Sequence, residues 1–313
     1  MKILIAGGSG FIGNSIIEYL DLNEHIEYHI LTRKHRLNYD NVHFHKWDGK
    51  TLGSWTSAIE ACDVVINLAG RSVKCRYTED NKNEIYNSRI ESTFILGKAI
   101  ENANKPPSLW INASTATIYR HETERANTED NGIFGQGFSV DVAKKWEETF
   151  HASYTPFTRK IVLRSAIAFG AKAEVFNIYK KHINIHMSGS HGIGDQMVSW
   201  IHEIDMVNAI KHFIINELSN GTYNLASPYA VSDIQFLKTF RTLMNKHNGL
   251  HIPEWALEIG AWWCGAETEM LLKSRWVYPE RLLNEGFEFE YAHHEDALYE
   301  LLNRRKEQIL ERA

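Results

Sequence analysis

Short apolar runs alternate with longer amphipathic stretches through the first half of the chain. The apolar runs have the length of β-strands and are expected at residues 2–6, 28–32, 42–47, 63–69, 109–114 and 160–165. Helix-length segments lie between most of them, notably 81–103 and 137–152. Strands separated by helices in this way are typical of a parallel sheet that is covered on both faces. The pattern therefore predicts an α/β fold with a doubly wound parallel sheet.

The second half of the chain has a less regular pattern, with helical character in 204–216 and 253–274. We expect a Rossmann-type domain formed by residues 1–170, to which 199–217 returns. The remaining segments, 171–198 and 218–313, are expected to form a smaller, mainly helical C-terminal substrate lobe. Because ligands of such sheets bind outside the carboxyl ends of the strands, we expect a substrate cleft between the two parts.

The composition argues against several classes of protein. The 313 residues carry a formal net charge of −5, so no overall positive field attracts nucleic acid or an anionic membrane. Three cysteines without C-x-x-C spacing, Cys62, Cys75 and Cys264, indicate a reduced compartment without a disulfide framework or zinc site. No apolar run approaches the length of a membrane span, and Met1 leads directly into a strand without room for a signal peptide. We expect a cytoplasmic protein whose partner is a small-molecule substrate.

A glycine-rich turn follows the first predicted strand. The sequence AGGSGFIGNSI begins at Ala6 and places Gly7, Gly10 and Gly13 three residues apart, between a strand-like and a helix-like run. In a doubly wound sheet this turn brings backbone N–H groups and a helix N-terminus to a pyrophosphate, and a Cβ would block the approach. Such turns also occur for packing reasons alone. The position between strand and helix favours a dinucleotide site.

The end of the second predicted strand indicates the type of dinucleotide. An NAD site places Asp or Glu about 20 residues after the glycines, where the carboxylate accepts a hydrogen bond from the ribose. This chain has Thr32, Arg33 and Lys34 there. A guanidinium can hold a 2′-phosphate with two hydrogen bonds, so the sequence predicts NADP(H). The alternative is a solvated basic turn.

Several motifs resemble those of the extended short-chain dehydrogenase/reductase superfamily. They are GGSGFIG at 7–13, NLAG at 67–70, STATIYR at 114–120 and LRSAIAFG at 163–170. The resemblance is closer to one branch, the atypical epimerase-like proteins with a C-terminal domain of unknown function. Its marks are NSRIEST (87–93), KKWEE (144–148), SWIHEIDMV (199–207), GTYNLASP (221–228) and PERLLNEGFEFEY (279–291). Together these motifs span nearly the whole chain.

The resemblance implies a set of residues that bind the cofactor. They come from the glycine turn, the second strand, the fourth strand and the long helix that follows it, and are Gly7, Gly10, Phe11, Ile12, Gly13, Thr32, Arg33, Leu68, Ala69, Gly70, Glu84 and Arg89. Glu84 and Arg89 have a plain alternative, because charged side chains on a helix are often simply solvated.

The sequence departs from the superfamily at the catalytic helix. Dehydrogenases of this kind carry Tyr-x-x-x-Lys there, and the lysine lowers the pKa of the tyrosine that transfers the proton. The corresponding helix reads GFSVDVAKKWEETF. Aligning the lysine with Lys144 places Val140 at the tyrosine position, and aligning it with Lys145 places Asp141 there. The resemblance implies Thr115 as the hydroxyl that holds the reacting oxygen, but the tyrosine is absent.

Three other side chains are candidates for the missing proton donor. Tyr119 leaves the active-site strand and is the leading candidate, although a tyrosine at this position is also common as packing. Tyr77 and His202 are the others, and a buried histidine often fills a structural role. The reaction can also proceed without a protein phenol.

The histidines near residue 182 are candidate metal ligands by their spacing. His182 and His186 share one face if a helix runs through them, and His191 and Asp195 follow. The β-branched residues between the two histidines are equally compatible with a strand, so no metal site is predicted.

The leading interpretation is an NADP(H)-dependent oxidoreductase or epimerase-like enzyme that acts on a small polar or carbonyl-containing substrate. A non-catalytic NADPH-binding regulator is the alternative from another class, and the missing tyrosine supports it. A nucleotide-sugar epimerase is a narrower alternative within the enzyme class. Related folds often pair through helices beside the sheet, so a homodimer is one option.

Overall fold

A seven-stranded parallel sheet forms the centre of the computed structural model, which describes residues 1–313 except 61, 259–272 and 311–313, and only the backbone over 305–310. The strands lie in the order β12 (Gly221–Leu225), β7 (Arg159–Ser165), β5 (Leu109–Thr115), β4 (Val64–Asn67), β1 (Lys2–Ala6), β2 (Glu27–Thr32) and β3 (Val42–Lys46). All neighbouring pairs are parallel. The predicted doubly wound α/β fold is confirmed.

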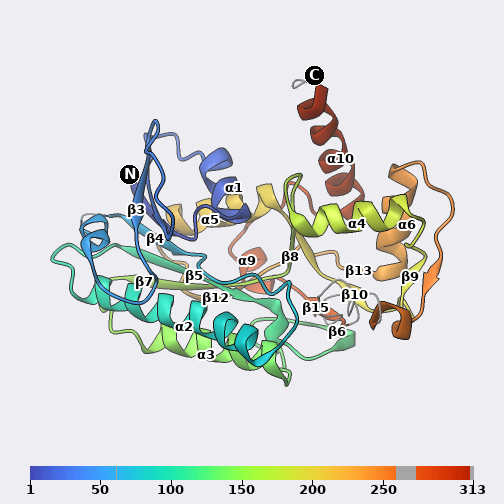
Figure 1. Ribbon diagram of the computed structural model, residues 1–313, viewed down its shortest axis with the longest axis horizontal. Coiled ribbons are helices and arrows are strands. Elements are labelled where there is room, and N and C mark those ends of the chain that lie inside the picture. Colours follow the sequence, from blue (N-terminus) through green and yellow to red (C-terminus); the bar gives the residue numbers. More distant parts are fainter. Residues whose placement is uncertain (61, 259–272, 311–313) are drawn as a thin grey trace.

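Helices cover both faces of the sheet, as Figure 1 shows. One face carries α1 (Phe11–Tyr19) and α5 (Glu203–Ile215), and the other carries α2 (Glu79–Glu101) and α3 (Phe138–Ala152). Helix α2 begins after Thr78, whose side chain accepts a hydrogen bond from the backbone N–H of Asn81. Such an N-cap satisfies one of the N–H groups that a helix leaves without an internal partner.

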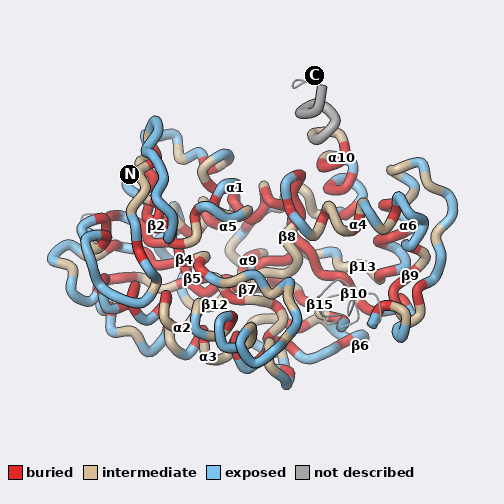
Figure 2. Tube along the Cα trace, viewed as in Figure 1, coloured by how far each residue is buried: buried red, intermediate tan, exposed pale blue. Residues whose placement is uncertain are grey.

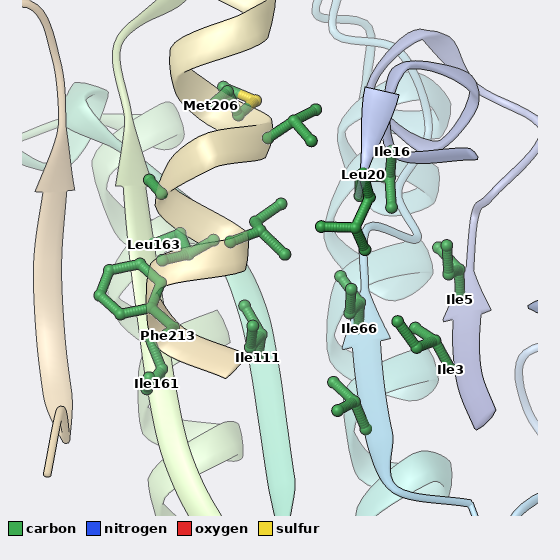
Figure 3. Packing of buried hydrophobic residues seen from close by; sticks show 14 of the residues in the cluster. Ile3, Ile5, Ile16, Leu20, Ile66, Ile111, Ile161, Leu163, Met206 and Phe213 are labelled. Carbon is green, nitrogen blue, oxygen red and sulfur yellow. The ribbon is translucent and has the colours of Figure 1, made fainter. Parts of the chain in front are cut away.

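The core on the α1/α5 face is built from alternate strand residues and one stripe of α5. Figure 3 shows these side chains, which are Ile3, Ile5, Ile66, Ile111, Ile161 and Leu163 from the strands and Met206 and Phe213 from α5. All are almost fully buried, and Figure 2 shows the buried strands in the middle of the molecule. Each such side chain contributes about 2 kcal/mol of hydrophobic free energy on burial.

The C-terminal lobe has its own core of aromatic side chains. Helices α4 (Glu174–Asn184), α6 (Asp233–Leu243) and α10 (His294–Leu310) surround it. The rings of Phe169 and Phe236 stack with their centroids 5.3 Å apart. The second core makes this lobe a separate packing unit beside the sheet.

Short strand pairs lie outside the central sheet. They are β8 (Ile167–Phe169) with β11 (Trp200–His202), β6 (Glu122–Asn127) with β15 (Arg275–Val277), β10 (Met197–Val198) with β13 (Val231–Ser232), and β9 (Ser190–His191) with β14 (His251–Ile252). The remaining short elements are η1 (Ser54–Ala58), η2 (Ala116–Ile118) and α9 (Glu280–Asn284). The β6–β15 pair joins a segment of the Rossmann part to a C-terminal segment, whereas β9–β14 and β10–β13 pair segments within the lobe.

The structure refines the predicted division of the chain. Helix α5 packs on the sheet, in agreement with the expected return of 199–217. The prediction that all of 218–313 belongs to the lobe is wrong for β12, because this strand pairs in parallel with β7 and is the seventh strand of the sheet. Of the helical stretch predicted at 253–274, residues 254–258 are helical and 259–272, with Trp262, Trp263 and Cys264, lie outside the described residues.

A buried charged group joins α10 to the Rossmann part. The Glu203 carboxylate pairs with the Arg304 guanidinium at 2.9 Å and accepts a hydrogen bond from the Ser15 hydroxyl at 2.8 Å. Glu203 is buried, so its charge needs these partners. None of the helices described is both long and apolar enough to cross a bilayer.

Candidate functional site

The glycine turn connects the end of β1 to the start of α1. Gly7 has φ +79°, and a Cβ there would lie 2.8 Å from the carbonyl carbon of Leu68. Gly13 allows close packing of α1, because a Cβ would lie 2.4 Å from the Cα of Gly8. Gly10 is the N-cap residue and provides no side-chain cap. Gly10 therefore offers no cap to the first N–H groups of α1, which have no intrahelical partners, and this end of a helix favours anions.

Three neighbouring strands deliver predicted cofactor residues to this same edge of the sheet. Thr32 ends β2 and is buried, and Arg33 follows it with an exposed side chain. Leu68 follows β4, and its N–H donates to the carbonyl oxygen of Ala6 at 2.8 Å. The structure therefore brings these segments together around the start of α1, as the resemblance implied.

A cavity of about 340 Å³ lies at the carboxyl ends of the strands, next to the glycine turn. Ile12 and Leu68 line it on the side of α1, and Thr115 lines it at the end of β5. The lobe contributes Tyr179 and Gln196 to the opposite part of its wall. The cavity thus lies between the Rossmann part and the lobe, where the sequence predicted a cleft.

Thr115 reaches this cavity with a hydroxyl that is already oriented. Its Oγ1 donates to Oγ1 of Thr117 at 3.0 Å and accepts from the N–H of Thr117 at 3.2 Å. Both threonines line the cavity. The pair can therefore present a hydroxyl donor to an oxygen atom bound between them and α1.

A buried ion pair lies behind the end of β5. The Arg164 guanidinium donates to both carboxylate oxygens of Glu147, from Nε at 2.9 Å and from Nη2 at 2.7 Å. The Ser114 hydroxyl also donates to Glu147, at 2.6 Å. The ion pair is almost fully enclosed, because its two side chains are only 7% and 9% exposed. It joins α3, β5 and β7 directly beneath the cavity.

Tyr119 belongs to this buried network and not to the cavity wall. Its hydroxyl accepts a hydrogen bond from Arg164 Nη1 and donates to Oδ1 of Asn224, each at 2.8 Å. The residue is only 1% exposed, and burial raises its pKa. The geometry does not support the prediction that Tyr119 transfers a proton, because both hydrogen-bonding directions of the phenol are already used. The sequence alone did not indicate that Tyr119 forms hydrogen bonds with Arg164 and Asn224.

Helix α3 presents no phenol to the cavity. Val140 is buried, and Asp141 is exposed. Lys144 donates from Nζ to the carbonyl oxygen of Gly135 at 3.2 Å. The cavity instead meets Ser139 of this helix, along with its apolar side chains. The superfamily's catalytic arrangement is therefore absent from α3.

Two tyrosines from other segments do line the cavity. The Tyr77 hydroxyl lies 3.3 Å from Oγ of Ser139. Tyr179 comes from α4, in the lobe, and burial raises its pKa. Sequence reasoning missed Tyr179, because it lies with Phe176 and Ile183 on the buried stripe of α4 and resembles an ordinary core residue. No motif distinguishes it.

Arg89 is a desolvated cation in the cavity wall. Its Nη1 donates to the carbonyl oxygens of Arg71 and Ile85, at 3.1 and 3.0 Å, and its guanidinium lies 5.3 Å from the centre of the Trp146 ring. Within the described part of the chain, no carboxylate pairs with it. Burial lowers the pKa of Arg89 to about 10, so the group stays charged at neutral pH. Such a cation favours an anion in the cavity.

Gly70 and Glu84 are two further residues that were predicted to contact the cofactor. A Cβ on Gly70 would lie 3.1 Å from Cζ of Arg89, so this glycine leaves room for the guanidinium. Glu84 is exposed and forms an ion pair with Arg71. Its role as a cofactor contact stays a prediction.

The histidine candidates have structural partners. His202 is fully buried, its Nδ1 accepts from the N–H of Ile204 at 3.2 Å, and its Nε2 lies 3.0 Å from a carboxylate oxygen of Glu300. His182 lies on α4, whereas His186 lies beyond the end of this helix. In the part of the chain that the structure describes, no three His, Cys, Asp or Glu side chains are placed to hold a metal ion.

The fold and the site define an extended short-chain dehydrogenase/reductase. A model of the NAD dependent epimerase/dehydratase family matches residues 3–226, and a model of a domain of unknown function, DUF1731, matches residues 252–301. The chain therefore belongs to the NAD dependent epimerase/dehydratase family. The second match agrees with the branch that the sequence motifs indicated.

Bacterial relatives match almost the whole chain. The chain is 28% identical to the epimerase family protein YfhF of Bacillus subtilis over 306 residues, which cover 98% of this chain and 99% of the relative. It is also 28% identical to the epimerase family protein SAR0825 of Staphylococcus aureus over 306 residues, with 97% and 99% covered.

Solved structures show the same fold. The human epimerase family protein SDR39U1, solved with NADPH, has a TM-score of 0.84 and 25% identity, with 96% of this chain and 99% of the human chain covered. The UDP-N-acetylglucosamine 4-epimerase of Bacillus cereus has a TM-score of 0.74 and 18% identity, with 96% and 95% covered. The second likeness concerns the fold alone.

Proposed function

We propose that this protein is an NADP(H)-dependent oxidoreductase or epimerase-like enzyme that acts on a small carbonyl-containing or polar substrate. The observation that carries the proposal is the shared cavity of Ile12 and Thr115. It joins the uncapped N-terminus of α1, which suits a phosphate, to a hydroxyl that can hold a reacting oxygen. The human relative solved with NADPH supports this assignment.

The residues present fit a dinucleotide with a 2′-phosphate. The glycine turn has no Cβ that would block a pyrophosphate, and the exposed Arg33 follows the neighbouring strand β2. Thr32 and Arg33 would hold the 2′-phosphate, and Arg89 would stabilise negative charge in the cavity. When bound, NADPH supplies a hydride for reduction of a carbonyl carbon. The Thr115–Thr117 pair would hold the carbonyl oxygen by a hydrogen bond from one of its two hydroxyls.

The first experiment measures cofactor binding. Purified protein freed of nucleotide is titrated with NADPH and with NADH while tryptophan fluorescence is followed. We expect NADPH to bind more tightly, and Arg33→Ala to weaken NADPH binding by about 10-fold or more while leaving NADH binding nearly unchanged, because one charge-assisted contact is lost. Lys50→Ala, on an exposed ion pair with Glu91, is the control for loss of surface charge. Equal losses for both nucleotides would contradict the assignment of Arg33.

The second experiment measures turnover. NADPH oxidation is followed with a panel of aldehydes, ketones and α-dicarbonyls. Thr115→Val, which keeps the shape and removes the hydroxyl, should lower kcat/KM by about 100-fold or more, as expected for loss of a donor to the reacting oxygen. Unchanged turnover in Thr115→Val would show that the reaction occurs elsewhere.

A non-catalytic NADPH-binding regulator is the second candidate. The absence of a tyrosine at both Val140 and Asp141, the two positions that align with the superfamily's tyrosine, favours it. This candidate predicts tight NADPH binding without oxidation by any carbonyl of the panel. The two experiments together therefore separate the two functions.

A further inference from the structure

A buried aspartate–histidine pair lies in the C-terminal lobe, outside the groups that the proposed function uses. Asp233 begins α6, and one of its carboxylate oxygens accepts a hydrogen bond from the backbone N–H of His191 at 2.8 Å. The other lies 2.9 Å from Nδ1 of His191. Both side chains are at most 1% exposed. The carboxylate therefore fixes the imidazole ring and binds its Nδ1–H, leaving Nε2 for another partner.

Nε2 of His191 has no hydrogen-bond partner among the described residues, and the ring is fully buried. A buried polar atom without a partner costs about 1–3 kcal/mol, so its presence requires a reason. Two rings of α4 are its neighbours. The ring of Tyr179 has its centroid 6.1 Å away at 72°, and the ring of His182 lies 6.0 Å away at 61°.

Tyr179 is the neighbour that also lines the cavity. Within the described residues, its hydroxyl makes no hydrogen bond. Aromatic side chains hold its ring in place, with the centroids of Phe236, Phe169 and Phe240 at 5.3, 5.9 and 6.4 Å. The phenol is thus held firmly, is only 4% exposed, and belongs to a residue that both lines the cavity and has the His191 ring as a neighbour.

We propose that Tyr179 is the proton donor of this enzyme, and that His191 and Asp233 return the proton to it. This inference rests on the proposed function. The phenol comes from the lobe, opposite the helix that carries it in other members of the superfamily. It would take the role of the tyrosine that α3 lacks.

The proton transfers balance in the direction of carbonyl reduction. As the carbonyl carbon receives a hydride, the π electron pair of the C=O bond moves to oxygen, and this oxygen takes the proton of the Tyr179 hydroxyl. The phenolate then takes a proton from Nε2 of the His191 imidazolium, whose positive charge the Asp233 carboxylate neutralises. A proton taken up from solvent then restores the His191 imidazolium. The net reaction consumes one hydride and one proton and gives an alcohol.

The first test observes the side chains directly and does not depend on turnover. Protein carrying [13Cζ]tyrosine and [15N]histidine is studied by NMR, and the Tyr179 and His191 signals are assigned by their loss in Tyr179→Phe and His191→Gln. We expect Tyr179→Phe to shift the Nε2 signal of His191, and NADPH to shift the Cζ signal of Tyr179. Tyr154→Phe is the matched control, because this phenol is 69% exposed and follows the end of α3. An Nε2 signal that does not respond to Tyr179→Phe would overturn the pairing.

The second test measures turnover on the same carbonyl panel. Tyr179→Phe should lower kcat by about 100-fold or more, the usual contribution of a general acid, while NADPH affinity stays within about twofold. His191→Gln should lower kcat by a smaller factor and change the dependence of kcat on pH, because the phenolate then regains its proton from solvent. Tyr154→Phe should retain the kcat of the unaltered protein.

The outcomes separate the two proposals. An active protein in which Tyr179→Phe loses nothing, or in which Tyr77→Phe is the inactive variant, overturns the role of Tyr179 and leaves the proposed function intact. A protein that binds NADPH but reduces no carbonyl overturns both. Loss of kcat in Tyr179→Phe with NADPH binding preserved supports both.

Discussion

The ion pair of Glu147 and Arg164 offers a quantitative test of how the cavity is supported. Glu147→Gln keeps the shape of the side chain but removes its charge, and leaves the guanidinium buried without a compensating carboxylate. The pair is more than nine-tenths buried and has two direct contacts, at 2.9 and 2.7 Å. Removing one partner of such a pair costs about 3–5 kcal/mol. In a chain of this size, that loss corresponds to a fall in Tm of about 5–8 °C.

The assay is urea and thermal unfolding followed by circular dichroism. The control is Glu148→Gln on the same helix, where the carboxylate is 65% exposed and lies 3.1 Å from Lys145. This exposed pair should contribute less than about 0.5 kcal/mol. The double variant Glu147→Met with Arg164→Met should recover about half of the loss in Glu147→Gln or more, because no uncompensated charge remains buried.

Two results would refute this reasoning. One is a loss in Glu147→Gln no greater than that in Glu148→Gln, which would mean that water reaches the buried pair. The other is a double variant less stable than either single variant, which would mean that the pair is itself a net source of stability. The same measurements with NADPH present would show how far the network supports the cavity.

Further predictions concern the cavity wall and the edge of the sheet. Gly70→Ala places a methyl group 3.1 Å from Cζ of Arg89. This change should weaken NADPH binding, measured by fluorescence titration, by about 10-fold. It should lower Tm, measured by thermal unfolding, by no more than a few degrees. Burial and the neighbouring His45 and His43 lower the pKa of His29 to about 4. The neutral ring therefore contributes fully to the free energy of unfolding above pH 6.5, and this contribution is lost as the pH falls from 6.5 towards 4. Allowing for the partial exposure of His29, the free energy of unfolding should fall by about 1 kcal/mol between pH 7 and pH 5. Urea unfolding at the two pH values should show a smaller fall in His29→Gln than in the unaltered protein.

The central sheet could be predicted from the sequence because its strands are buried on both faces. The apolar runs at 109–114 and 160–165 correspond to β5 and β7 within one residue at each end. The strand β12 was missed, because its sequence GTYNL mixes polar and apolar residues and looks like a turn. It is an edge strand, and only its pairing with β7 reveals its place in the sheet.

Some residues of the candidate site could likewise be located from the sequence, and others could not. The glycine turn, Arg33 and Thr115 lie at the ends of strands, so local sequence and the topology of the sheet together fix where they meet. Tyr119 and Tyr179 show the limit of this reasoning. Both are buried tyrosines in segments of ordinary composition, and only tertiary contacts show that Tyr119 is fully hydrogen-bonded while Tyr179 lines the cavity.

If the lobe supplies the proton donor, a member of this family can lack a tyrosine at residues 140 and 141 of α3. The sheet edge supplies backbone N–H groups and the Thr115 hydroxyl, and these depend on strands that cannot move without disrupting the core. The lobe faces the substrate end of the cavity with side chains from α4 and the 196–199 segment. A proton donor needs only to reach the reacting oxygen, so its origin in the lobe is chemically equivalent to an origin on α3. Tyr179 would then couple proton transfer to the docking of the lobe, and substitutions that loosen α10 from Glu203 should lower kcat more than they weaken NADPH binding.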